Sequence, residues 1–266
     1  MMSVAHEATL VWRARALLRV LVGREVAARH AGTALGVLWP YLQPLLSVAA
    51  YYLVFDIVFA FRMDSHAPTS RVGAYLIVGA LPWMAFCDAV TRSMVSLLEA
   101  GSILQKNALP PVLFPVRAVL GSALIYAPLI AIVAVGYGPY HRFAPALFGL
   151  VLLVMLQIVL CIVLGFLLAI FAAALRDTIQ VVTFLLTVGI YLSPALFPIS
   201  LFPERWQWVL WANPMTSLML GYQTVLLKGQ WPALETWIVT LAWIGLLTVM
   251  LGSAIRRSRD QLVDWL

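Results

Sequence analysis

The chain has 266 residues, of which 63% are hydrophobic and 11% are charged, and its formal net charge is +6. Soluble domains carry about 25% charged residues, so this composition excludes a water-soluble fold and predicts an integral membrane protein whose helices each need about 20 apolar residues. The basic residues lie between apolar runs and form no single stripe, which favours a role in membrane topology over nucleic-acid binding.

The N-terminal residues 7–30 have the pattern of an amphipathic helix at the membrane interface. Apolar side chains recur at helical spacing, at Leu10, Ala14, Leu17 and Leu21. Basic side chains fall between them, at Arg13, Arg15, Arg19, Arg24 and Arg29. These arginines either lie along anionic headgroups or form the ordinary positive flank of a first span. Both interpretations place the N-terminus in the cytoplasm.

Apolar runs further along the chain predict six transmembrane helices, at 36–61, 73–98, 116–137, 146–175, 178–193 and 236–255. The fifth is short, and the segment 194–214 that follows is rich in Leu, Phe and Trp, so we expect part of it to re-enter the membrane. Basic residues are more numerous in the segments expected inside, which places both termini in the cytoplasm.

The predicted fold class is therefore all-α, with one transmembrane domain over 1–266. It comprises an interfacial region at 1–35, a six-span bundle at 36–255 and a cytoplasmic tail at 256–266.

Ionisable residues within the predicted spans are few, and each is a candidate functional residue. Asp88 and Arg92 lie four residues apart on one face of the second span, where they can pair with each other or serve transport. Asp56 lies near the outer end of the first span and can reach the interface.

The sequence contains no pattern for catalysis or metal binding. A Walker A loop needs a lysine after glycine, but Lys106 follows Gln105 and Lys228 follows Leu227. The four histidines have no paired ligand spacing, and no G-x-S-x-G nucleophile motif occurs. We therefore expect no catalytic residue, no metal and no cofactor in this chain.

Aromatic residues gather where the membrane interfaces are expected. They are Tyr51, Tyr52, Phe55, Phe59 and Phe61 late in the first span, and Trp206, Trp208 and Trp211 in the outer loop. Such residues anchor a protein at the interface, and the same rings would stack on sugars in a glycan pathway.

Several ordered motifs resemble the permease subunit of ATP-binding-cassette exporters for lipid-linked polysaccharides, the family that exports O antigen, teichoic acid and capsule. The N-terminal motifs are Arg24-Glu25, Arg29, Thr33-Ala34-Leu35-Gly36-Val37-Leu38-Trp39 and Gln43-Pro44-Leu45. His30 departs from the family's usual tyrosine. Later motifs are Gly79-Ala80-Leu81-Pro82-Trp83, Arg176-Asp177, Leu192-Ser193-Pro194, Phe197-Pro198, Pro203-Glu204-Arg205-Trp206 and Asn213-Pro214-Met215-Thr216.

The resemblance implies a homodimer in the bacterial inner membrane, bound to two copies of a separate ATPase that carries ATP and Mg. The cargo it implies is a glycan on a polyprenyl-diphosphate carrier. The arginines Arg13, Arg19, Arg24 and Arg29 would contact the lipid diphosphate. The predicted pathway residues are Trp39, Tyr51, Tyr52, Phe55 and Tyr191. The predicted ATPase-coupling residues are Gln105, Lys106, Asn107, Pro110, Pro111, Arg176 and Asp177. The predicted outer gate is Pro194, Phe197, Trp206, Asn213 and Pro214.

Three alternatives stay open from the sequence. The first is an exporter permease of the same architecture for a small lipid or drug. The second is a membrane-embedded enzyme acting on polyprenyl carriers, which would turn over substrate without an ATPase. The third is a secondary transporter, which would depend on an ion gradient.

Overall fold

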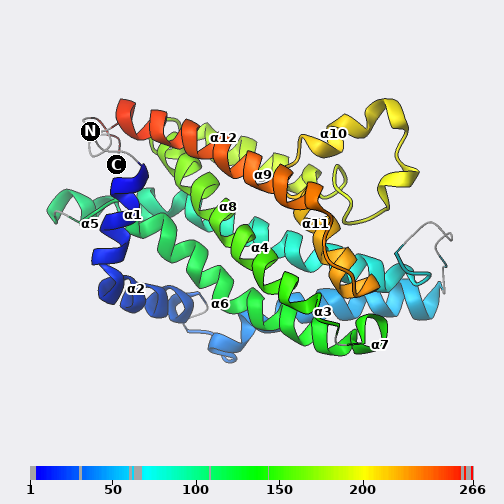
Figure 1. Cartoon of the computed structure of the whole chain (residues 1–266). Helices are drawn as coiled ribbons and strands as arrows, with labels where there is room; N and C mark the ends of the chain where they lie inside the picture. Colours follow the sequence, from blue (N-terminus) through cyan, green and yellow to red (C-terminus); the bar gives the residue numbers. More distant parts are fainter. Residues whose placement is uncertain are drawn as a thin grey trace.

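The computed structural model describes residues 4–29, 32–59, 62, 68–107, 109–142, 144–258, 261 and 265. His30 and Phe61, which the sequence analysis named, lie outside this set, as do His66 and most of the predicted tail. Within the described part the secondary structure is helical, apart from an isolated antiparallel bridge between Arg62 and Arg71. Long helices run side by side, and both termini lie at one end of the bundle (Figure 1).

The N-terminal region forms two helices, α1 (Val4–Arg13) and α2 (Arg15–Ala28), where the sequence predicted one. The break falls at Ala14, whose φ of −90° and ψ of 15° leave the helical region. The buried apolar residues of α2 are Leu18 and Val22, whereas Leu17 is exposed. Of the predicted apolar residues, Leu10, Ala14 and Leu21 are half-buried, so the interfacial role of this side remains a prediction.

Among the described residues, five helices are long and apolar enough to span a membrane. They are α3 (Trp39–Tyr51) continued by the π-helix η2 (Tyr52–Val58), α4 (Val72–Glu99), α6 (Leu113–Gly136), α8 (Leu147–Ala174) and α12 (Leu234–Ser258). These match five of the six predicted spans. A short 3₁₀ turn, η1 (Gly36–Leu38), precedes α3.

The predicted fifth span corresponds to α9 (Asp177–Gly189), a helix of only 13 residues. At 1.5 Å per residue it is roughly 20 Å long, which is less than the hydrocarbon core of about 30 Å. The chain turns at residues 190–196 instead of continuing to residue 193 as a helix. Its role as a complete sixth span remains a prediction.

Helix α4 forms the centre of the bundle. Most of its residues are buried, and Tyr75, Val90 and Met94 are fully enclosed. The helix packs against α6 and α8 and also contacts α9 and α11. Close approach to α8 depends on Gly165, because a Cβ there would lie 2.6 Å from the Cβ of Ser93. Small residues at such crossings let membrane helices pack tightly.

Helices α3 and α9 are the least covered elements of the bundle. In α3 the buried residues are Pro40 and Pro44, and neither η2 nor α9 has a buried residue. Both helices are strongly apolar, so lipid or another protein must cover these faces in the membrane.

The segment between α9 and α12 consists of short elements. The first part contains η3 (Ile199–Leu201), η4 (Glu204–Trp206) and α10 (Gln207–Trp211). The second contains α11 (Thr216–Gln223) and the π-helix η5 (Thr224–Lys228), which the sequence analysis did not predict. Leu218, Met219 and Tyr222 of α11 are fully enclosed. The buried short helix therefore comes after the segment 194–214 that was expected to re-enter.

Two further short helices lie at opposite ends of the bundle. Helix α5 (Gly101–Lys106) follows α4 near the termini, and α7 (Gly138–His141) lies at the far end, between α6 and α8 (Figure 1).

Candidate functional site: a charged cavity beneath the N-terminal helix

Helix α2 places a stripe of side chains against the membrane helices. Leu18, Val22, Glu25 and Arg29 are spaced at one face of a helix, and α2 packs chiefly on α6. The stripe begins apolar and ends charged. Close contact at the charged end depends on Gly121 of α6, because a Cβ there would lie 2.9 Å from Cγ of Glu25 and 3.2 Å from Nη2 of Arg29.

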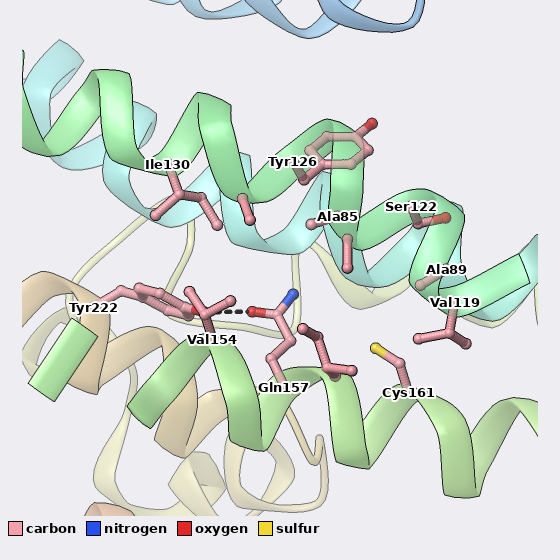
Figure 2. A pocket seen from close by; sticks show the side chains of 13 residues that line it. Ala85, Ala89, Val119, Ser122, Tyr126, Ile130, Val154, Gln157, Cys161 and Tyr222 are labelled. Carbon is pink, nitrogen blue, oxygen red and sulfur yellow. Dashed lines mark hydrogen bonds between the residues drawn. The ribbon is translucent and has the colours of Figure 1, made fainter. Parts of the chain in front are cut away.

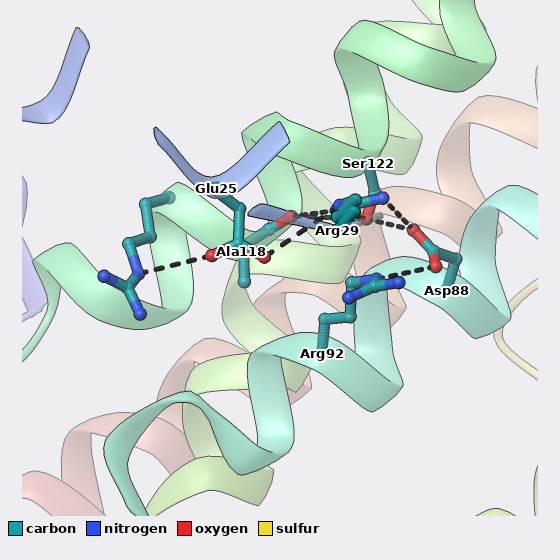
Figure 3. A network of polar contacts seen from close by, with 7 residues as sticks. Glu25, Arg29, Asp88, Arg92, Ala118 and Ser122 are labelled. Atoms are coloured by element: carbon teal, nitrogen blue, oxygen red, sulfur yellow. Dashed lines mark hydrogen bonds and ion pairs between the residues drawn. The ribbon is translucent and has the colours of Figure 1, made fainter. Parts of the chain in front are cut away.

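Arg29 is fixed inside the protein by contacts to two membrane helices. Its side chain is 2% exposed, and Nη1 donates to Oδ2 of Asp88 on α4 at 2.8 Å. Nη2 donates to Oγ of Ser122 on α6 at 3.0 Å, and the Ser122 hydroxyl donates to Asp88 in turn. Figure 3 shows these groups converging on the Asp88 carboxylate. The arginine therefore joins the end of α2 to both α4 and α6.

Asp88 has a second basic partner on its own helix. Nε of Arg92 donates to Oδ1 of Asp88 at 2.9 Å, which confirms the pairing predicted from their spacing. The contribution of Arg29 was not predicted, because the two residues are 59 apart in sequence. A signal was present, since a carboxylate within a span requires partners and Ser122 is a polar residue in the neighbouring predicted span.

Glu25 extends the network from Arg29 to Arg117. Its two oxygens lie 3.9 Å from Nε of Arg29 and 3.6 Å from Nε of Arg117. Both of these Nε atoms are buried and have no hydrogen-bond partner in the described part of the chain. Arg29 and Arg117 thus each have a buried Nε–H group without an acceptor, beside the carboxylate of Glu25.

Two adjoining cavities, which together are called the charged cavity below, open around this network. Their volumes are about 280 and 360 Å³, and both are lined by Glu25, Arg92 and Glu99. The second also includes Arg24 and Arg117. Arginine guanidinium groups bind phosphate oxygens bidentately, so a cavity with several arginines suits a phosphate or diphosphate. Among the described residues no three metal-binding side chains come together.

The four arginines predicted to meet a lipid diphosphate occupy different positions. Arg13 and Arg19 are exposed on α1 and α2, Arg24 is exposed and lines the cavity, and Arg29 is paired within the protein. Arg92 and Arg117 line the same space and were not predicted as ligand contacts.

The residues predicted for ATPase coupling lie at the end of the bundle that holds the termini. Gln105 and Lys106 are exposed at the end of α5, Asn107 follows them, and Pro110 and Pro111 are half-buried before α6. Arg176 and Asp177 are exposed at the turn from α8 to α9. Exposure leaves these positions accessible to another protein.

The predicted outer gate is anchored through Pro194. Its carbonyl accepts hydrogen bonds from the Tyr75 hydroxyl at 2.7 Å and from Nε2 of Gln223 at 2.6 Å. Phe197 stacks on Phe202, with ring centroids 5.9 Å apart. The remaining gate residues, Trp206, Asn213 and Pro214, lie in the short elements and turns before α11.

The predicted pathway residues lie mainly on the poorly covered span. Tyr52 is exposed, whereas Trp39, Tyr51 and Phe55 are half-buried on α3 and η2. Tyr191, after α9, is 62% exposed. Their role in a pathway remains a prediction.

A small cavity in the middle of the bundle separates α4, α6 and α8. It measures about 30 Å³, and alanine side chains make up much of its lining. At its edge the Tyr222 hydroxyl donates to Oε1 of Gln157 at 2.8 Å (Figure 2). Nε2 of Gln157 donates to the Pro82 carbonyl at 2.9 Å. This size accommodates about one water molecule, so the cavity is a packing feature of the core.

Residues 16–227 match the ABC-2 type transporter family. The chain belongs to this family. It is 30% identical over 256 residues to the O-antigen export system permease protein RfbA of Myxococcus xanthus, covering 94% of this chain and 95% of that protein. It is also 24% identical over 242 residues to an O-antigen export system permease protein RfbA of Klebsiella pneumoniae, covering 90% of each. An ABC-2 permease is a multi-pass membrane protein, in agreement with the five spanning helices.

Proposed function

We propose that this chain is the transmembrane subunit of an ABC exporter that moves a polyprenyl-diphosphate-linked polysaccharide of the O-antigen type across the bacterial inner membrane. The observation that carries this proposal is the similarity to O-antigen export permeases over nearly the whole chain, in an ABC-2 family member. Neither a drug exporter nor an enzyme acting on the lipid carrier has comparable support.

The exporter would contain two copies of this chain and two copies of a separate ATPase. The sequence lacks a Walker A lysine, so ATP and Mg would bind the partner. A second copy would cover the apolar faces of α3 and α9. The exposed residues at α5 and at the α8–α9 turn would meet the ATPase, and this end of the bundle with both termini would then lie in the cytoplasm.

The charged cavity would receive the lipid diphosphate from the inner leaflet. Arg24 lies at the cavity on the exposed side of α2, with Arg13 and Arg19 on the surface beyond it. A diphosphate attracted by these surface arginines would meet the guanidinium groups of Arg92 and Arg117, which line the cavity. Arg29 would hold the cavity wall, because its guanidinium is already paired with Asp88.

The glycan would then pass along the aromatic side chains of α3 and η2 toward the segment between α9 and α11. This segment would act as the outer gate. Its attachment to Tyr75 and Gln223 through the Pro194 carbonyl would link the gate to the central helices.

The proposal is tested by purifying the chain co-expressed with candidate ATPases and measuring co-elution and ATP hydrolysis with lipid-linked glycan. We expect a stable complex whose hydrolysis responds to the glycan. A chain that binds no ATPase and acts on substrate alone would contradict the proposal.

A matched pair of variants tests the diphosphate site. Arg24→Gln should reduce glycan export at normal protein level, whereas Arg257→Gln, at an exposed arginine of α12 that lines neither cavity, should not. Equal export by both variants would show that Arg24 does not contribute to binding the diphosphate.

A further inference from the structure

A second large pocket lies at the far end of the bundle, away from the charged cavity. It has a volume of about 450 Å³ and lies where η2, the start of α4 and the α6–α7 junction meet. Its polar lining consists of Tyr52, Asp56, Arg71, Tyr137 and Tyr140. This volume falls within the range of small-ligand sites, about 300 to 1,000 Å³.

The Asp56 carboxylate is held in this pocket by the first turn of α4. The backbone N–H of Gly73 donates to Oδ1 of Asp56 at 3.0 Å. The approach requires glycine, because a Cβ at residue 73 would lie 2.8 Å from Cγ of Asp56. Asp56 belongs to the π-helix η2, and such helical irregularities often occur at functional sites. Oδ2 has no hydrogen-bond partner among the described residues, so one carboxylate oxygen is fixed in place and free to accept.

Three tyrosines surround this carboxylate with unused hydroxyl groups. Tyr137 and Tyr140 lie with ring centroids 5.4 Å apart, and Tyr52 is 45% exposed. In the part of the chain that the structure describes, none of the three hydroxyls has a hydrogen-bond partner. Burial raises the pKa of Tyr137, so its phenol remains a neutral donor. Tyrosine hydroxyls in such positions pair with water or with a ligand, so these three donors are available to a ligand.

The charges of the pocket indicate what kind of ligand fits. Arg71 and Asp56 both line it without forming an ion pair with each other. A positive and a negative group together disfavour a purely anionic or cationic ligand. The rest of the wall is largely apolar, including Val48 and Ala74. The pocket therefore suits a neutral molecule that carries hydroxyl donors and acceptors on one side and an apolar face on the other.

We infer that this pocket binds a neutral sugar residue, with a tyrosine ring against the apolar face of the sugar and Asp56 and Arg71 at its hydroxyls. The inference rests on the proposed function, since it takes the sugar to be part of the exported glycan. The site lies at the end of the bundle opposite the charged cavity, so it would engage the glycan after the lipid diphosphate has been recognised at the other end.

The test uses the full-length chain in lipid nanodiscs and a panel of methyl glycosides of mannose, galactose, rhamnose and N-acetylglucosamine. Binding is measured by saturation-transfer NMR. Tyr140→Leu removes the aromatic ring together with its hydroxyl and should weaken binding about fivefold. Asp56→Asn keeps an oxygen for the Gly73 N–H but removes the charge, and should weaken binding about tenfold. Phe148→Leu removes an aromatic ring that is 74% exposed on α8, outside the pocket, and should leave binding unchanged.

Saturable binding that Tyr140→Leu and Asp56→Asn weaken, but Phe148→Leu does not, would support the inference. Absence of saturable binding by every glycoside, or equal binding by all variants, would overturn it. Co-elution with the ATPase and glycan export, measured in parallel on the same variants, separate this result from the proposed function. If the protein exports glycan but binds no glycoside, the proposed function stands and only the inference of a sugar site in this pocket is overturned.

Discussion

Substitution of Asp88 by leucine should destabilise the protein more than loss of either of its basic partners. The substitution removes the carboxylate that Arg29 contacts at 2.8 Å and leaves a guanidinium group whose side chain is 2% exposed. Ser122 and Glu25, whose Oε1 lies 3.9 Å from Nε of Arg29, would then be the remaining side-chain partners of Arg29. Breaking a buried pair costs about 3–5 kcal/mol, and we expect the lower part of this range because the more distant Glu25 carboxylate still offsets part of the charge.

The opposite substitution should cost less. Arg29→Met leaves Asp88 with Arg92 at 2.9 Å and with the Ser122 hydroxyl, so the carboxylate stays partnered. We expect a loss of about 1–3 kcal/mol. The double variant Arg29→Met/Asp88→Leu should be more stable than Asp88→Leu alone, because replacing a whole buried pair with apolar side chains is often close to neutral.

These stabilities can be compared by SDS-induced unfolding in mixed micelles, followed by circular dichroism. Arg92→Gln is the control, since it removes the other partner of the same carboxylate. The Arg92 side chain is 37% exposed, so its loss should cost only about 0.5 kcal/mol. If Asp88→Leu were no less stable than Arg29→Met, the buried charge would not dominate. If Arg29→Met abolished export at unchanged stability, Arg29 would contact the substrate instead.

Three further predictions concern other parts of the bundle. Burial raises the pKa of Glu7, so the folded state favours the protonated side chain and loses stability as the pH rises above the ordinary carboxyl range. Glutamine carries no charge at either pH, so Glu7→Gln should raise Tm at pH 7 but not at pH 4. Gly79→Ala should lower Tm, because the new Cβ would lie 2.6 Å from the carbonyl oxygen of Ala195. Gln157→Leu should cost about 1–3 kcal/mol by leaving the buried Tyr222 hydroxyl without its acceptor, and should cost less when combined with Tyr222→Phe.

Different outcomes would contradict each of these predictions. A Glu7→Gln effect on Tm that is equal at pH 4 and pH 7 would show that the carboxylate charge is not responsible. An unchanged Tm for Gly79→Ala would mean that residues near Ala195 shift freely away from α4. Additive losses in the Gln157→Leu/Tyr222→Phe variant would show that the two side chains are not coupled.

The sequence predicted the long spans well because their signal is local. An apolar run of about 20 residues is sufficient to predict a membrane helix, and α4, α6, α8 and α12 each begin and end within about three residues of the prediction. The contact between Asp88 and Arg92 was predictable for the same reason, since residues four apart on a helix are neighbours.

The short elements were harder to predict. Helix α9 ends at Gly189, although the apolar run continues to residue 192, because the chain turns there to place Pro194 against Tyr75 and Gln223. Helix α11 is too short to give a span signal, and its burial comes from packing against α4, α8 and α12. Local hydropathy therefore encodes neither the end of α9 nor the burial of α11.

Composition and local spacing determined that this chain lies in a membrane, where its long helices fall and which motifs it shares with polysaccharide exporters. Tertiary structure alone decided that Arg29 pairs with Asp88 instead of facing the lipid, and that Asp56, Arg71 and three tyrosines share one pocket. The physical reason is that charges and phenols are satisfied by groups from distant helices, whose approach depends on glycines such as Gly121 and Gly73 and on the packing of the whole bundle.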